Sequence, residues 1–249
     1  MTGETTSLAL PNSARDEWRH WARFIRRPHL PEHHAPFTRS VIGMLRMLSI
    51  DLMVMTVLIG AIGIATALGF ELPENALNNL DMGLGTVALL VVVAPVLEEL
   101  GFRSWLSGKP GHVIAALIIG ISLTAAAIAG MQNTGDDAEA AVGLAAIGGV
   151  IIAIIVVIVL WKRPPMRWFA RAFPMFYWLS TLSFALVHLA NYTEGALAIL
   201  LPLVLPQFVL GSILGYVRVH YGLWAAIALH MLHNSLIVGV VVAAAQAAA

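Results

Sequence analysis

The amino-acid sequence predicts an all-α fold, a polytopic bundle of membrane helices with about seven spans. Hydrophobic residues make up 59% of the 249 positions, charged residues only 11%, and the mean hydropathy is +0.84. A water-soluble domain of this size needs more charge than this to cover its surface. The apolar residues also form long runs, and about 20 such residues are enough to cross a bilayer as a helix.

The charge and cysteine content exclude two classes of function. The formal net charge is zero, so there is no basic excess of the kind that recruits nucleic acid, and we expect no nucleic-acid partner. The chain contains no cysteine, which removes disulfides and thiol chemistry from consideration.

Residues 1–40 are predicted to form a cytoplasmic tail in front of a transmembrane domain at 41–249. The tail is rich in arginine and lacks the short apolar core of a removable signal peptide. Its apolar side chains recur at helical spacing, at Trp18, Trp21, Ala22 and Ile25. Ser13 with Asp16 is typical of a helix start. We therefore expect a basic amphipathic helix that lies on a surface of anionic lipid. The alternative is a helix that packs on loops of the same chain.

The long apolar runs define the spans of the transmembrane domain. They cover about 41–69, 84–106, 112–130, 141–161, 174–191, 196–218 and 222–244. Lysine and arginine occur in the tail, in the second-to-third and fourth-to-fifth connections and at the end of the sixth span, and in no other connection. Because positive loops stay in the cytoplasm, this alternation predicts an amino terminus inside and a carboxyl terminus outside.

Several polar or small residues within the spans are expected to have structural roles. An ionisable side chain at mid-bilayer costs about 2.5–3.5 kcal/mol, so each one needs an explanation. Arg46 lies near the cytoplasmic end of its span and is interpreted as an anchor. For Asp51 we favour a structural role, such as a pair with a residue of another helix, over catalysis, and His233 is expected to pack. Gly211 and Gly215 predict a close helix contact within the bundle.

The second span carries two adjacent glutamates after a long aliphatic run. Glu99 and Arg103 are four residues apart, so they share a helix face and can form an ion pair. Glu98 points about 100° away and is free to face a cavity. A free carboxylate at this position can serve as a general base. The alternative is a charge cluster at the membrane edge, although a pair of glutamates gains nothing as an anchor.

Two further polar groups lie in apolar surroundings on other spans. His188 follows Phe184 by four residues in the fifth span, and His230 precedes Asn234 by four residues in the seventh. The spacing of His230 and Asn234 places both on one helix face at similar depth. With the span edges above, His188 lies roughly 9 Å deeper than Glu98 and His230, at 1.5 Å per residue.

These three constellations resemble the motifs of the CPBP family, which comprises CAAX proteases and bacteriocin-processing or self-immunity (Abi-type) proteins. Glu98 to Arg103 matches EExxxR, Phe184 to His188 matches FxxxH, and His230 to Asn234 matches HxxxN. The motifs stand in the family's order on separate spans. The stretch Pro206-Gln207-Phe208 also looks like the family's sequence between the last two motifs. The resemblance covers a core of residues 84–238.

The resemblance implies an intramembrane endopeptidase, a hydrolase that cleaves a membrane-associated peptide or protein. Glu98 and His188 would activate a water, and His230 and Asn234 would stabilise the oxyanion. Glu99, Arg103 and Phe184 would support them. Peptide hydrolysis needs a base for water and donors aimed at the tetrahedral oxygen, so the residue types fit this chemistry.

A zinc-dependent mechanism is the alternative to this metal-free one. Glu98, His188 and His230 are also a set of zinc ligands with one open position. The chain has no HExxH motif, and asparagine is a poor zinc ligand but a good oxyanion donor. We therefore favour a mechanism without a metal cofactor.

Two other functions use the same residues. A member of the family without catalysis would act as a scaffold or as a bacteriocin-immunity protein, and a proton-coupled transporter would use the glutamates and histidines as a relay. Broken helices at matching positions of two repeated halves would favour a transporter, and the sequence shows no such symmetry. The composition is typical of a bacterial protein. We therefore expect a location in the bacterial cytoplasmic membrane, with the site facing the cytoplasm.

Overall fold

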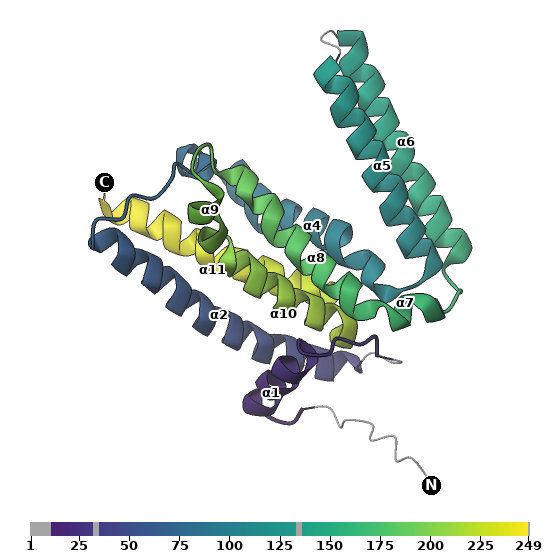
Figure 1. Cartoon of the computed structure of the whole chain (residues 1–249), viewed down its shortest axis with the longest axis horizontal. Coiled ribbons are helices and arrows are strands. Elements are labelled where there is room, and N and C mark those ends of the chain that lie inside the picture. The colour runs from purple at the N-terminus through teal and green to yellow at the C-terminus, as the bar shows by residue number, and fades with distance from the viewer. Residues whose placement is uncertain (1–10, 32–34, 133–135, 249) are drawn as a thin grey trace.

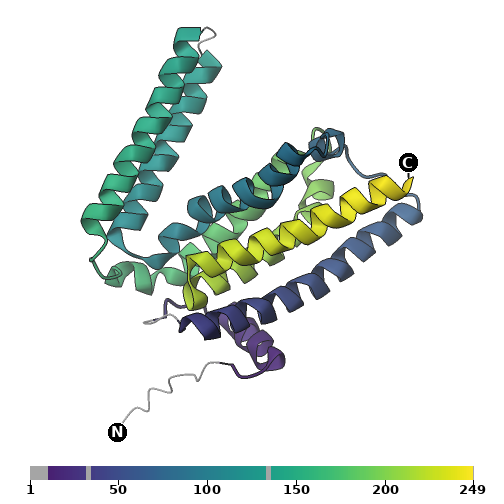
Figure 2. The same ribbon diagram turned by 180° about the vertical axis from the view of Figure 1, so that it is seen from behind.

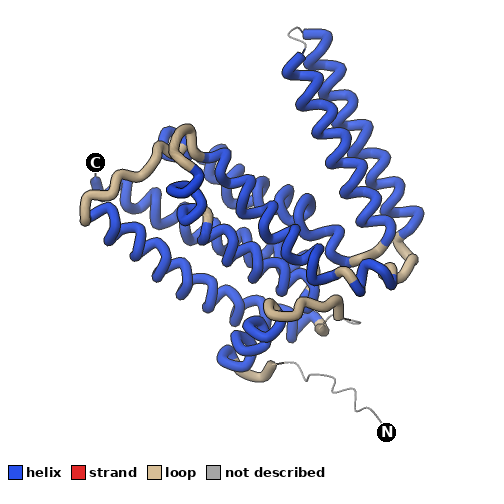
Figure 3. Tube along the Cα trace, viewed as in Figure 1, coloured by secondary structure: helices blue, strands red, loops and turns tan. Residues whose placement is uncertain are grey.

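The computed structural model describes residues 11–31, 35–132 and 136–248, and this part of the chain forms helices and no β-strand (Figure 3). In chain order the helices are α1(Ala14–Phe24), α2(Phe37–Ala67), α3(Leu84–Ala88), α4(Ala94–Arg103), α5(Pro110–Gln132), α6(Asp136–Leu160), α7(Arg167–Arg171), α8(Phe173–Val187), α9(Leu197–Leu203), α10(Leu205–Tyr221) and α11(Leu223–Ala248). The predicted all-α class is confirmed.

Five helical segments of the described chain are long and apolar enough to cross a membrane. They are Phe37–Ala67, Leu84–Ser107, Val142–Leu160, Phe173–Asn191 and Leu223–Ala243. The pair α9 and α10, bent by 45° at Val204, gives a sixth if it counts as one span. The described apolar part of α5, Pro110–Ala126, is shorter. The structure therefore does not confirm the count of seven spans, and the orientation of the termini stays a prediction.

Helix α10 lies at the centre of a bundle with α2, α4, α8 and α11 (Figure 1). All its residues from Leu210 to Tyr221 are buried, because α8, α2 and α11 pack around it. Helices α5 and α6 form a hairpin that leans away from this bundle in both views (Figures 1 and 2). The hairpin contacts the rest mainly through the turn Ser104–Ser107, and its exposed apolar side chains are those expected of a lipid-facing segment.

The contact between α8 and α10 depends on the two glycines of the GxxxG pattern. A Cβ atom on Gly215 would lie 2.8 Å from the ring of Tyr177, and one on Gly211 would lie 3.1 Å from the ring of Phe184. The Tyr177 hydroxyl donates a hydrogen bond of 2.7 Å to the carbonyl of Ser212. The predicted close contact within the bundle is therefore confirmed, and it brings the Phe184 ring next to α10.

Asp51 and His233 pair with each other across α2 and α11. Asp51 Oδ2 lies 2.6 Å from His233 Nδ1, and both residues are buried. A buried carboxylate needs such a partner to offset its desolvation. Asp51 thus has the partner on another helix that the sequence left open, and that partner is the buried His233.

Helix α1 begins as the sequence predicts but docks on the protein itself. The Ser13 side chain accepts a hydrogen bond from the backbone N–H of Asp16, which caps the helix. Trp18, Trp21 and Ile25, expected to face lipid, pack instead against the core formed with α2 and α10. The helix thus packs on the protein itself, as in the alternative considered from the sequence, and these side chains remain only partly buried. Contact of the exposed α1 arginines with anionic lipid stays a prediction.

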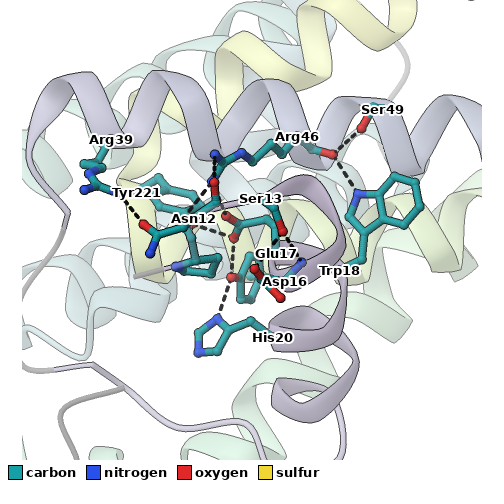
Figure 4. A network of polar contacts seen from close by, with 12 residues as sticks. Asn12, Ser13, Asp16, Glu17, Trp18, His20, Arg39, Arg46, Ser49 and Tyr221 are labelled. Carbon is teal, nitrogen blue, oxygen red and sulfur yellow. Dashed lines mark hydrogen bonds and ion pairs between the residues drawn. The ribbon is translucent and has the colours of Figure 1, made fainter. Parts of the chain in front are cut away.

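A network of polar side chains holds α1 on the bundle (Figure 4). The hydroxyls of Tyr216 and Tyr221 donate to Glu17 Oε1 at 2.6 and 2.5 Å. His20 Nδ1 lies 2.7 Å from the Tyr216 hydroxyl, which accepts from it. Arg46 donates to the carbonyls of Pro11 and Asn12 at 2.8 and 2.7 Å. Arg46, for which we expected a role as a membrane anchor, therefore binds the segment that precedes α1.

The pH dependence of this docking should contain two opposing contributions. Burial raises the pKa of the Glu17 carboxyl in the docked helix. Glu17 therefore takes up a proton more readily when docked than when undocked, so acidification favours docking. Burial, aided by Arg23 and His29, lowers the pKa of His20, so protonation of His20 below its usual pKa of about 6.5 disfavours docking.

In the wild-type protein we expect the docking of α1 to change little with pH, because the two contributions oppose each other. In Glu17→Gln only the His20 contribution remains, so α1 should undock as the pH falls. Hydrogen–deuterium exchange of residues 14–24 at several pH values, corrected for intrinsic exchange, measures this. His20→Asn is the matched variant and should instead dock more tightly at acid pH. Equal profiles in the two variants would contradict the assignment.

Candidate active site

The segment that carries the two glutamates changes its helical pitch just before them. Residues Leu89–Val93 form a π-helical turn, and α4 continues from Ala94 with Pro95 in its first turn. Proline has no N–H, and its ring collides with the carbonyl four residues earlier, so it disturbs a continuous α-helix here. After this irregularity Glu98, Glu99 and Arg103 lie on regular α-helix.

Glu99 and Arg103 form the ion pair that their spacing predicts. Arg103 Nη1 donates to Glu99 Oε1 at 2.6 Å, and both side chains have no exposed surface. The ring of Phe184 covers the guanidinium, with Arg103 Cζ 3.8 Å from the ring centroid. An aromatic face stabilises a cation in this position. Phe184 therefore covers one side of the pair.

His230 lies between the two glutamates. Its Nδ1 is 3.0 Å from Glu99 Oε1, and its Nε2 is 3.6 Å from Glu98 Oε2. Because a carboxylate only accepts, Nδ1 must carry a proton, and Nε2 is left to face Glu98. Glu98 differs from Glu99 in its environment, since 28% of its side chain is exposed. The structure thus separates a buried glutamate from an accessible one, as the helix geometry predicts.

His188 follows α8 next to the same aromatic ring. Its Nδ1 lies 2.7 Å from the carbonyl of Phe184 and donates to it, so Nε2 carries the lone pair in the neutral ring. The Phe184 ring centroid is 4.9 Å from that of His188 and 5.7 Å from that of His230. Phe184 therefore contacts both histidines. His188 is near the group, but within the described part of the chain it forms no hydrogen bond with Glu98 or His230.

Asn234 contacts the backbone of the glutamate-bearing segment. Its Nδ2 donates to the carbonyl of Leu90 at 2.8 Å, inside the π-helical turn. One of its two amide N–H groups is committed to this bond, and the second remains for another acceptor.

Two residues outside the motifs hold the end of α4. Ser180 donates to the carbonyl of Phe102 at 2.6 Å. The buried Arg218 donates to the carbonyls of Arg103 and Ser104 at 3.0 and 3.1 Å. Carbonyls at the end of a helix have no backbone donor within the helix, so these side chains supply the donors. A cation such as Arg218 is also favourable there, because the helix dipole is negative at this end. The sequence marked Arg218 only as a charge that closes a span, and nothing in it marked Ser180.

The three candidate zinc ligands are not gathered into one group in the described part of the chain. Within residues 11–31, 35–132 and 136–248, no group of three or more His, Asp or Glu side chains is close enough to hold a metal ion. Glu98 and His230 are neighbours, whereas within the described residues His188 bonds to the carbonyl of Phe184 and to neither of them. We therefore derive no step through a metal.

The remaining arrangement has the parts of a general acid–base centre. An accessible carboxylate and a histidine with a free Nε2 can take and return protons, and a second histidine is backed by a buried carboxylate. Such groups act strongly in an apolar bundle, because water does not screen them.

A comparison with models of known protein families identifies a family for most of the transmembrane domain. A family model described as "Type II CAAX prenyl endopeptidase Rce1-like" matches residues 81–236, which include all the site residues above. This is consistent with the resemblance drawn from the three motifs. No curated protein and no solved structure matches the chain.

Proposed function

The chain belongs to the Rce1-like family of type II CAAX prenyl endopeptidases, since the family model covers more than half of it, and we propose that it hydrolyses a peptide bond within the membrane. The substrate is a membrane-associated peptide or protein. The observation that carries this proposal is the position of His230, held by the buried Glu99 at one nitrogen and 3.6 Å from the accessible Glu98 at the other.

In the proposed reaction Glu98 and His188 activate a water molecule. Either the carboxylate of Glu98 or the free Nε2 of His188 takes a proton from the water while its oxygen bonds to the peptide carbonyl carbon. The C–N bond of the tetrahedral intermediate then breaks, and the same proton passes to the leaving amine. The partly exposed position of Glu98 supports this role, because water must reach the base.

His230 and Asn234 stabilise the oxyanion in this proposal. With Nδ1–H directed at Glu99, a second proton on Nε2 gives an imidazolium that donates into the site. The carboxylate of Glu99 stabilises that charge, and Arg103 holds Glu99 in place. The second N–H of Asn234 is the other donor, next to the one bound to Leu90.

We also propose that the enzyme resides in a bacterial cytoplasmic membrane with this site facing the cytoplasm. The distribution of positive charge supports the cytoplasmic side, since arginines lie on α1, α7 and the final turns of α4 and α10. The bacterial membrane rests on the composition alone.

Purified protein in liposomes should cleave at least one substrate in a panel of membrane-anchored peptides, and His188→Ala should lower the rate by about 10²–10⁴-fold. Ser235→Ala is a matched control, because this exposed serine of α11 bonds only to a carbonyl of its own helix. Full activity of His188→Ala would overturn the assignment. Binding without cleavage would favour a scaffold or immunity protein, and proton-coupled uptake would favour a transporter.

The metal-free mechanism predicts that activity survives chelation. After exhaustive treatment with a zinc chelator, we expect unchanged cleavage and no stoichiometric zinc by elemental analysis. If activity is lost on chelation, returns when zinc is added, and one zinc ion is bound per chain, the protein is instead a metalloenzyme.

A further inference from the structure

The turn Leu89–Val93 leaves one backbone acceptor without its partner. In this π-helical turn each N–H bonds five residues back, and the N–H of Ala94 donates to the carbonyl of Leu89. The next bond in the same pattern would run from residue 95 to the carbonyl of Leu90. Residue 95 is proline and has no N–H, so the helix cannot make that bond.

Asn234 supplies the missing donor from a different helix. Its Nδ2 lies 2.8 Å from the carbonyl of Leu90. This carbonyl lies in an apolar span, where an unpaired backbone group is costly because no water reaches it. The side chain of Asn234 thus takes the place of the absent Pro95 N–H.

We propose that Asn234, besides its proposed role at the oxyanion, is a positioning residue that stabilises the π-helical turn in front of Pro95 and thereby sets the direction of the glutamate pair. A π turn carries an extra residue relative to an α turn, so everything after it is rotated by about 100° around the helix axis. That rotation decides which side chain of α4 faces His230. The consequence for catalysis rests on the proposed function, whereas the consequence for stability does not.

The same asparagine links two halves of the site in space. His230 is one turn before Asn234 on α11 and bonds to Glu99 on α4 at 3.0 Å. The Asn234–Leu90 bond lies two turns before Glu99 on the same segment. Two hydrogen bonds between the same two helices fix both their separation and their rotation, whereas a single hydrogen bond leaves the rotation free.

A double-mutant cycle between Pro95 and Asn234 tests this inference in the full-length protein. Asn234→Ala alone should lower the melting temperature by roughly 3–6 °C, because the Leu90 carbonyl loses its donor. In the Pro95→Ala background the restored backbone N–H can serve that carbonyl, and the same change should then cost less than about 2 °C. Asn234→Leu, which keeps a similar volume but has no donor, should behave like Asn234→Ala in both backgrounds.

The turnover number per folded enzyme separates positioning from general stability. Asn234→Ala should lower kcat by about 10²-fold with little change in KM, since small misplacements of catalytic groups have effects of this size. In the Pro95→Ala background, the loss of kcat caused by Asn234→Ala should become smaller. It should not disappear, because the proposed oxyanion donor is removed in both backgrounds.

Two results would overturn the inference. Equal temperature shifts with Pro95 in place and with Pro95→Ala would mean that the carbonyl of Leu90 does not depend on Asn234. Equal kcat ratios in the two backgrounds would assign Asn234 to the oxyanion alone. If no variant cleaves any substrate, the proposed function fails, and the melting temperatures still decide the structural inference.

Discussion

Glu98→Gln is expected to lower kcat by about 10²–10⁴-fold while the protein remains folded, because the amide keeps the volume of the side chain but cannot take a proton. Part of the Glu98 side chain is exposed, and its carboxylate approaches His230 Nε2 at 3.6 Å. Its replacement therefore leaves no buried charge without a partner. Cleavage rates of the purified variant, together with its melting temperature, measure the two effects separately.

Glu99→Gln is the matched control for this experiment, since it makes the same chemical change one residue along. Glu99 is fully buried and accepts hydrogen bonds from both Arg103 and His230 at one oxygen. Its loss of charge leaves the Arg103 cation buried without a counter-ion, which costs about 3–5 kcal/mol. We expect this variant to lose stability, whereas Glu98→Gln loses only activity. A Glu98→Gln enzyme with normal turnover would exclude Glu98 as the base.

The motifs on α4 and α11 could be predicted from the sequence because they depend on local helix geometry. A spacing of four residues is enough to place Glu99 beside Arg103, whatever the rest of the bundle does. The same periodicity separates Glu98 from Glu99, and His233 from His230, in direction. The structure agrees, since His233 turns to Asp51 on α2 and His230 turns to α4.

The docking of α1 could not be predicted in the same way. Glu17 and His20 are polar, so the pattern indicates that their side of the helix faces solvent. The tryptophans on the other side favour contact with lipid. The partners that bury them, Tyr216 and Tyr221, are about 200 positions away at the end of another helix. Periodicity within a single helix contains no information on such contacts, because they depend on how the whole bundle is assembled.

The π-helical turn is an intermediate case. A proline such as Pro95 interrupts a helix, but its presence alone does not specify whether the segment kinks, breaks or widens. The outcome depends on a donor for the Leu90 carbonyl, and Asn234 on α11 supplies it. His188 is similar, since its position beside the site depends on the bend of the chain after α8 and on the Phe184 ring, not on its depth counted along a span.

Arg103→Met is expected to destabilise the protein by about 3–5 kcal/mol, because it leaves the carboxylate of Glu99 buried without its cation. Methionine can occupy much of the same space under the Phe184 ring, so the loss reflects charge more than volume. Unfolding in a denaturant series measures this change. Arg171→Met is the matched control, since this arginine of α7 is exposed, and it should shift stability by less than about 0.5 kcal/mol.

The double variant Arg103→Met, Glu99→Leu distinguishes a structural pair from a functional one. Removing both buried charges should restore most of the lost stability, since an apolar pair of similar volume replaces a buried ion pair at little cost. Activity should not return, because His230 Nδ1 then has no carboxylate to direct its ring and to stabilise its imidazolium form. A double variant that is both stable and active would mean that Glu99 and Arg103 serve only the packing of α4.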